Sequence, residues 1–133
     1  MGYLTNNGLT IRTIVARAIS RSNRWHKGDL NNWSPLEWAG AMCGEAGEAA
    51  NAAKKLKRLT DEILSINKAE RDLKSLAEAR AVVAKEVADV LLYAVVLWAS
   101  VGITPREAEE IICAVFNRKS EEYGFPEKLE IEE

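Results

Sequence analysis

The amino-acid sequence predicts an all-α protein, because its composition and the spacing of its apolar residues both favour that fold class. The 133 residues include only 3 Pro and 8 Gly, which is few for the many turns of an all-β sandwich. Hydrophobic residues make up 47% of the chain and charged residues 29%, as in ordinary globular proteins. We therefore expect one domain over residues 1–133, a bundle of four to five helices, with an acidic C-terminal tail at about 125–133.

The first helix is predicted over about residues 8–23. Apolar residues recur there at helical spacing, at Leu9, Ile11, Ile14, Val15, Ala18 and Ile19. The stretch from Trp25 to Trp33 holds Gly, Asp and Asn residues and predicts a loop. A second helix is expected after it, because Ser34 suits an N-cap, Pro35 the first helical position and Glu37 the third position of a capping box.

Charged and capping residues delimit the next two segments. The second helix is predicted to end near Arg58, where a run of cations suits the negative end of the helix dipole. Thr60 and Asp61 predict the start of a third, highly charged segment that reaches about residue 76. A fourth helix is expected over about 77–101, ending near Gly102.

The last helix opens with the same signature as the second. Thr104 suits its N-cap, Pro105 its first position and Glu107 its third. Gly124 predicts a stop after about Tyr123, because glycine favours the left-handed conformation that closes many helices.

Two of the predicted helices each carry a pair of acids three residues apart. Glu45 and Glu48 lie among Ala and Gly, while Glu86 and Asp89 lie at the edge of the most apolar run, residues 87–103. Residues three apart share one face of a helix, so each pair points in one direction. Carboxylates that meet in a dry interior repel one another and lose their hydration, so cations must offset their charge.

A hard divalent metal ion would offset the charge of several carboxylates at once, so we expect such an ion at this cluster. Mg²⁺ prefers oxygen ligands and commonly shares the phosphates of a substrate, with Mn²⁺ as a substitute. The chain has a single histidine, which excludes His-rich metal sites. The plain alternative is that the acids are solvated and pair with nearby Lys or Arg. Lys55, two turns after Glu48, is expected either to meet a phosphate or only to suit the end of its helix.

The paired motif, Glu45-x-x-Glu48 and then Glu86-x-x-Asp89, resembles that of the MazG-like superfamily of all-α nucleoside triphosphate pyrophosphohydrolases. The flanking sequences are similar too: SPLEWAGAMCGEAGEAANAAKKL at 34–56, KEVADVLLYAVVL at 85–97 and FNRKSEEYGFPEKL at 116–129. The resemblance covers about residues 25–129.

The resemblance implies Mg²⁺-dependent hydrolysis of a (deoxy)nucleoside triphosphate to the monophosphate and pyrophosphate. The metal ligands and catalytic acids would be Glu45, Glu48, Glu86 and Asp89. The residues that would contact the nucleotide are Tyr93 on the nucleoside, Trp33 at the base pocket, and Asn117 and Lys119 on the last helix. Nucleotide-pool sanitation in the cytoplasm is the corresponding role.

Two other functions stay open. One is a phosphoribosyl-ATP pyrophosphohydrolase, which also carries paired acids, although the Trp-rich start of the second helix disfavours it. The other is a non-catalytic helical assembly module whose acids bind structural cations. Pyrophosphate release from nucleotides separates the enzymes from the assembly module.

The composition also predicts the partners. The fourth helix is apolar on nearly every side, which favours a homo-oligomer, dimer or tetramer. Its apolar run is short for a membrane span and contains Asp89, so we expect no membrane contact. A net charge of −2 predicts no stable nucleic-acid complex. Cys43 and Cys113 form no disulfide framework and are expected to be buried.

Overall fold

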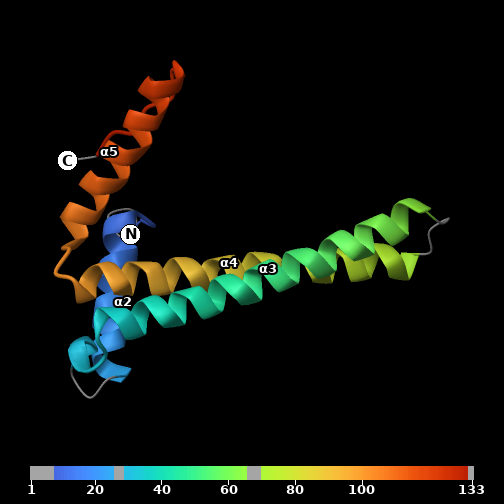
Figure 1. The fold of residues 1–133 in the computed structure, drawn as a ribbon, viewed down its shortest axis with the longest axis horizontal. Coiled ribbons are helices and arrows are strands. Elements are labelled where there is room, and N and C mark those ends of the chain that lie inside the picture. The colour runs from blue at the N-terminus through green and yellow to red at the C-terminus, as the bar shows by residue number, and fades with distance from the viewer. Residues whose placement is uncertain (1–7, 26–28, 66–69, 132–133) are drawn as a thin grey trace. The chain divides into compact units, whose positions relative to one another are not determined.

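The computed structural model describes residues 8–25, 29–65 and 70–131, and within these residues every regular element is helical (Figure 1). The elements are α2 (Ile11–Trp25), the 3₁₀ turn η1 (Leu30–Asn32), α3 (Pro35–Ser65), α4 (Glu70–Ser100) and α5 (Pro105–Tyr123). The predicted all-α fold class is therefore confirmed.

Part of the loop predicted from Trp25 to Trp33 is helical, while its residues 26–28 lie outside the described residues. Helix α2 extends to Trp25, two residues beyond the predicted end, and η1 forms inside the predicted loop. The Asp29 side chain caps η1 by accepting a hydrogen bond of 2.7 Å from the backbone N–H of Asn31. A short acidic side chain at that position thus satisfies a backbone donor that a loop would leave to water.

Helix α3 begins at Pro35 as predicted, but the predicted end near Arg58 is wrong. The helix continues to Ser65 and includes Thr60 and Asp61, which were expected to start a new segment. The Lys57 ammonium contacts the Asp61 carboxylate one turn later at 2.7 Å, and the Thr60 hydroxyl donates to the carbonyl of Leu56. These contacts support a continuous helix, and the run holds no Gly or Pro to end it.

Helix α4 starts earlier than predicted, at Glu70, so no helix boundary lies at residues 76–77. Its end is as expected, because Gly102 follows with a φ of +85°. The predicted start of α5 is confirmed: the Thr104 hydroxyl accepts a hydrogen bond of 3.1 Å from the Glu107 N–H. Gly124, at φ +72°, closes α5 in the left-handed conformation.

The described chain divides into two compact units, residues 1–35 with 95–133 and residues 36–94. In the first unit α2 packs against α5. Val15 of α2 and Ala108 of α5 are fully buried, and the Arg12 guanidinium contacts the Glu109 carboxylate at 2.8 Å. The buried apolar residues of this unit among those described are Val15, Ala18, Leu30, Val95, Val96 and Ala108.

The acidic tail folds back along α5 in the same unit. The Asn117 carboxamide pairs with the backbone of Leu129, accepting from its N–H at 2.8 Å and donating to its carbonyl at 3.0 Å. The Lys128 ammonium contacts the Glu121 carboxylate at 2.8 Å and lowers the pKa of Glu121 through a hydrogen bond and its charge. Residues 125–131 are therefore held by polar contacts; the remainder of the predicted tail lies outside the described residues.

The second unit is a hairpin in which α3 and α4 run side by side (Figure 1). Near its open end, the buried Trp38 ring lies 6.2 Å from the ring of Tyr93. Ala52, the other buried apolar residue of this unit among those described, lies farther along α3. No single helix of the described chain is both long and apolar enough to cross a membrane.

Candidate functional site

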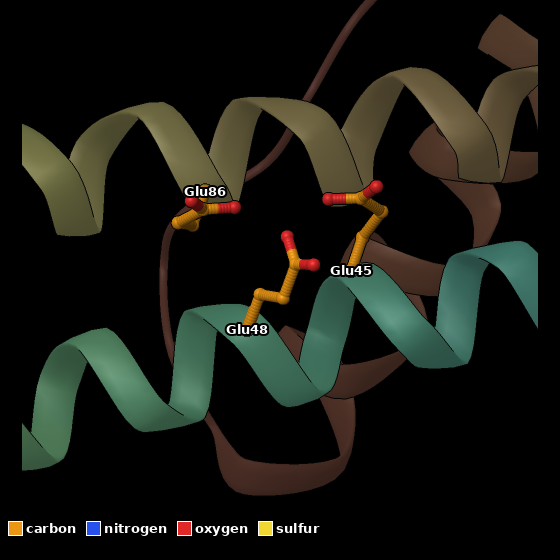
Figure 2. A group of neighbouring side chains, drawn as sticks. All are labelled: Glu45, Glu48 and Glu86. Atoms are coloured by element: carbon orange, nitrogen blue, oxygen red, sulfur yellow. The ribbon is translucent and has the colours of Figure 1, made fainter.

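Three of the four predicted acids converge inside the hairpin. Glu45 and Glu48 point from successive turns of α3 toward Glu86 on α4 (Figure 2). One carboxylate oxygen from each lies within 4.8 Å of the others. They meet because Glu45 and Glu48 are three residues apart on α3 and α4 runs antiparallel to α3. We call Glu45, Glu48 and Glu86 the acid cluster.

The three acids differ in their access to water. The Glu86 side chain is only 15% exposed, and its Oε2 atom is buried without a hydrogen-bond partner. Glu45 is half-buried, and Glu48 is exposed. An unpaired buried carboxylate oxygen is costly, so Glu86 is the member of the cluster that most requires a further partner.

The electrostatics of the acid cluster act most clearly on Glu45. Its partial withdrawal from water raises the pKa of Glu45, and the neighbouring charges of Glu48, Asp89 and Glu86 raise that pKa further, together with a hydrogen bond to Glu48. All of these contributions oppose the ionised form. The cluster therefore accumulates negative charge that a bound cation would relieve.

Asp89, the fourth predicted acid, has a partner of its own. The Lys85 ammonium lies 2.9 Å from Asp89 Oδ2, one helical turn away, and 3.6 Å from Glu86 Oε1. This hydrogen bond and the charges of Asp89 and Glu86 raise the pKa of Lys85. Sequence reasoning did not assign Lys85 to the site, although its i, i+4 spacing to Asp89 was the available signal.

The acid cluster fits a hard divalent cation. Two oxygens on opposite sides of one Mg²⁺ lie about 4.2 Å apart, since each Mg–O bond is about 2.1 Å. The carboxylate oxygens of the acid cluster lie within 4.8 Å of one another, close to that separation. The unpartnered oxygen of Glu86 supplies a ligand atom that no protein group satisfies within the described chain. The donor set holds only carboxylates, which suits Mg²⁺ or Mn²⁺.

Gly44 lies one helical turn before Glu48 on the same side of α3. A Cβ atom added at Gly44 would meet no other atom within 4 Å, so a ligand beside the acids would meet no side chain at this position.

Two predicted nucleotide contacts lie in the same unit as the acid cluster. Tyr93 lies one turn after Asp89 and packs on the Trp38 ring. Lys55 is exposed on α3, two turns after Glu48. The structure thus positions both along the helices that hold the cluster, and their predicted contacts with a nucleotide stay predictions.

Three other predicted residues belong to the first unit. Trp33 directly follows η1, and its N–H donates to the Leu30 carbonyl at 3.4 Å. Asn117 holds the backbone of Leu129, and the Lys119 ammonium lies 5.7 Å from the centre of the Tyr123 ring. The roles predicted for Trp33, Asn117 and Lys119 likewise stay predictions.

The two cysteines depart from the expectation that both are buried. Cys43 is exposed on α3, and Cys113 is half-buried on α5. Cys43, two residues before Glu45, lies on the side of α3 that faces away from the acid cluster. Apolar character in the sequence did not distinguish this outer side from the side that α4 covers.

Comparison with protein-family models, with curated proteins and with solved structures finds no match to this chain.

Proposed function

We propose that the protein is a divalent-metal-dependent hydrolase that converts a (deoxy)nucleoside triphosphate to the monophosphate and pyrophosphate. The observation that carries this proposal is the acid cluster, in which carboxylate oxygens of Glu45, Glu48 and Glu86 lie within 4.8 Å of one another. A buried oxygen of Glu86 without a protein partner supports the same conclusion.

The chemistry of the cluster suits attack on a phosphate. Bound Mg²⁺ would neutralise charge on phosphate oxygens and favour ionisation of an attacking water. The residues that would hold it are Glu45, Glu48 and Glu86, with Asp89 joining if Lys85 releases it. A carboxylate that the metal does not fully occupy would accept the proton of the water.

The choice of a nucleoside triphosphate rests on the resemblance of the acid motifs to those of MazG-like pyrophosphohydrolases. In this proposal, Lys55 contacts a phosphate, and Tyr93 and Trp33 pack against the nucleoside and its base. Asn117 and Lys119 contact the nucleotide from α5. Removal of unwanted nucleotides in the cytoplasm is the role that follows, with the protein acting as a homo-oligomer.

A panel of nucleotides tests the proposal. The purified protein is incubated with each deoxynucleoside and ribonucleoside triphosphate, and with phosphoribosyl-ATP, in the presence of Mg²⁺ or Mn²⁺. We expect pyrophosphate and the monophosphate from at least one deoxynucleoside triphosphate. Hydrolysis of phosphoribosyl-ATP alone would favour that narrower enzyme, while no hydrolysis of any compound would favour the assembly module.

Two conservative variants then test the site. Glu45→Gln and Asp89→Asn keep the side-chain shape but remove a negative charge each. We expect each to lower the rate of pyrophosphate release by at least about 100-fold, the scale of losing one strongly placed charge in a metal site. The matched control is Glu122→Gln, an exposed glutamate of α5, which should leave the rate unchanged. An undiminished rate in both site variants would refute the site assignment.

A further inference from the structure

Lys85 lies between the two acids that α4 contributes to the predicted site. Its ammonium group contacts Asp89 Oδ2 at 2.9 Å and Glu86 Oε1 at 3.6 Å. Asp89 follows Lys85 by one helical turn, whereas Glu86 is its immediate neighbour, and adjacent residues of a helix do not ordinarily face each other. The ammonium therefore reaches both carboxylates of the pair, and at neutral pH it brings a positive charge to them.

The four predicted acids are thereby divided between two kinds of partner. The acid cluster offers oxygens within 4.8 Å of one another, and Asp89 is not a member of it. The Asp89 carboxylate instead accepts a hydrogen bond from Lys85. Glu86 belongs to both arrangements, because its Oε1 atom lies near the ammonium while its Oε2 atom is buried without a partner in the described chain. This second oxygen of Glu86 is thus left for a cation other than Lys85.

The ammonium group takes a position that a second divalent cation would otherwise suit. A cation bound by Glu86 and Asp89 would have to take Asp89 Oδ2 from Lys85 and remain close to its ammonium. Cations at such short range repel one another strongly. An ammonium group donates hydrogen bonds but offers no coordination position to a water molecule. Lys85 therefore neutralises the α4 pair without creating a second place where water could be ionised.

We propose that Lys85 takes the place of a second metal ion, so that the hairpin binds a single divalent cation at the acid cluster. Asp89 is then a positioning residue, which holds the ammonium beside Glu86 rather than binding the metal. Lys85 keeps Asp89 when the cation binds, and Asp89 joins the metal ligands only when Lys85 is removed. The inference rests on the proposed function for the presence of a metal, and it adds the number of ions and the role of Lys85.

Counting bound Mn²⁺ tests the proposal without a substrate. The full chain is dialysed to equilibrium against a series of Mn²⁺ concentrations, and the bound metal per chain is measured. We expect a single Mn²⁺ per chain in the wild type and in Lys85→Arg, which keeps the positive charge. Lys85→Met loses the charge but keeps a long side chain, and it should bind a second Mn²⁺. The matched control, Lys54→Met, removes an exposed lysine of α3 and should keep a single ion.

Electron paramagnetic resonance shows where the second ion binds. Two Mn²⁺ ions that share the Glu86 carboxylate are close enough to couple magnetically, whereas an ion bound to distant acids gives the spectrum of an isolated Mn²⁺. We expect an isolated signal from the wild type and a coupled signal from saturated Lys85→Met. Adding Asp89→Asn to Lys85→Met removes a carboxylate that the second ion requires, so the coupled signal should be lost. Circular dichroism verifies that all variants keep their helical content.

The possible results separate this inference from the proposed function. A coupled pair of Mn²⁺ ions in the wild type would overturn the inference, and so would a single ion in Lys85→Met. Either result would leave the metal-dependent hydrolase standing. A second, coupled ion in Lys54→Met would also overturn it, because loss of any lysine of the hairpin would then suffice. Wild-type protein that binds no Mn²⁺ would overturn both the inference and the proposed function.

Discussion

At the scale of single residues, the acid cluster brings together carboxylates that repel one another. Burial of one Glu86 oxygen without a partner and the raised pKa of Glu45 both disfavour the folded, metal-free protein. The sequence predicts this cluster, because two i, i+3 acid pairs with apolar neighbours point in common directions. It does not predict that Lys85 neutralises Asp89, since that choice depends on which side chains the hairpin leaves near each acid.

Glu45→Gln should stabilise the metal-free protein. The folded-state pKa of Glu45 lies above that of an ordinary glutamate, about 4.3. The folded state therefore binds more protons than the unfolded state between these two pKa values, and stability falls as pH rises through that window. At neutral pH in EDTA, we expect the melting temperature of Glu45→Gln to exceed that of the wild type by a few degrees.

The same variant should also show a weaker rise in melting temperature as the pH is lowered toward 5. A lower melting temperature in EDTA at neutral pH would contradict the assignment of Glu45 to a repulsive cluster. Glu122→Gln, at an exposed position of α5, provides the control for removal of one carboxylate.

Lys85→Met should lower the melting temperature of the metal-free protein and strengthen its binding of Mg²⁺. Asp89 loses the ammonium that lies 2.9 Å away, so the cluster gains net negative charge. We expect a lower melting temperature without metal and Mg²⁺ binding that is severalfold tighter by calorimetry. The raised pKa of Lys85 means that its contribution to stability is complete at neutral pH and is lost only as pH rises through that folded-state pKa. Unchanged Mg²⁺ affinity, with Lys54→Met as control, would show that Lys85 does not compete with the metal.

At the scale of elements, caps and helix ends account for where the sequence predicts well and where it does not. The start of α3 at Pro35 and both ends of α5 follow from local chemistry that the sequence displays, namely Thr104 with Pro105 and a glycine after Tyr123. The end of α3 was predicted wrongly, because Thr60 and Asp61 suit both a cap and a helix interior. Only their i, i−4 contacts with Leu56 and Lys57 distinguish the two.

Thr104→Ala tests the cap of α5. The hydroxyl that accepts a hydrogen bond from the Glu107 N–H is lost, so the free energy of unfolding should fall by about 1 kcal/mol. Urea unfolding monitored by circular dichroism measures this change. Thr104→Ser keeps the hydroxyl and should recover most of the loss. Equal stability of the alanine and serine variants would show that the cap does not stabilise α5.

At the scale of the whole molecule, the sequence predicts the fold class but not the division of the chain. Helical spacing and the lack of turn residues are local properties of the sequence. They predict that helices form, but they do not predict which helices pack against one another. The exposure of Cys43 depends on which segments cover which face of α3. Apolar residues read the same in the sequence whether their own chain or another copy covers them. The acid cluster could be predicted from the two acid pairs and their apolar neighbours, whereas the two-helix hairpin that brings Glu45, Glu48 and Glu86 together could not.

We propose that the three clustered carboxylates together bind a divalent cation. Calorimetric titration of Mg²⁺ into the wild-type protein, Glu86→Gln and the control Glu122→Gln tests it most directly, because it requires no knowledge of the substrate. We expect saturable Mg²⁺ binding by the wild type and by Glu122→Gln. In Glu86→Gln we expect a loss of about tenfold to 100-fold in affinity, or of all binding. Wild-type protein that binds no Mg²⁺, or Glu86→Gln with undiminished affinity, would contradict it.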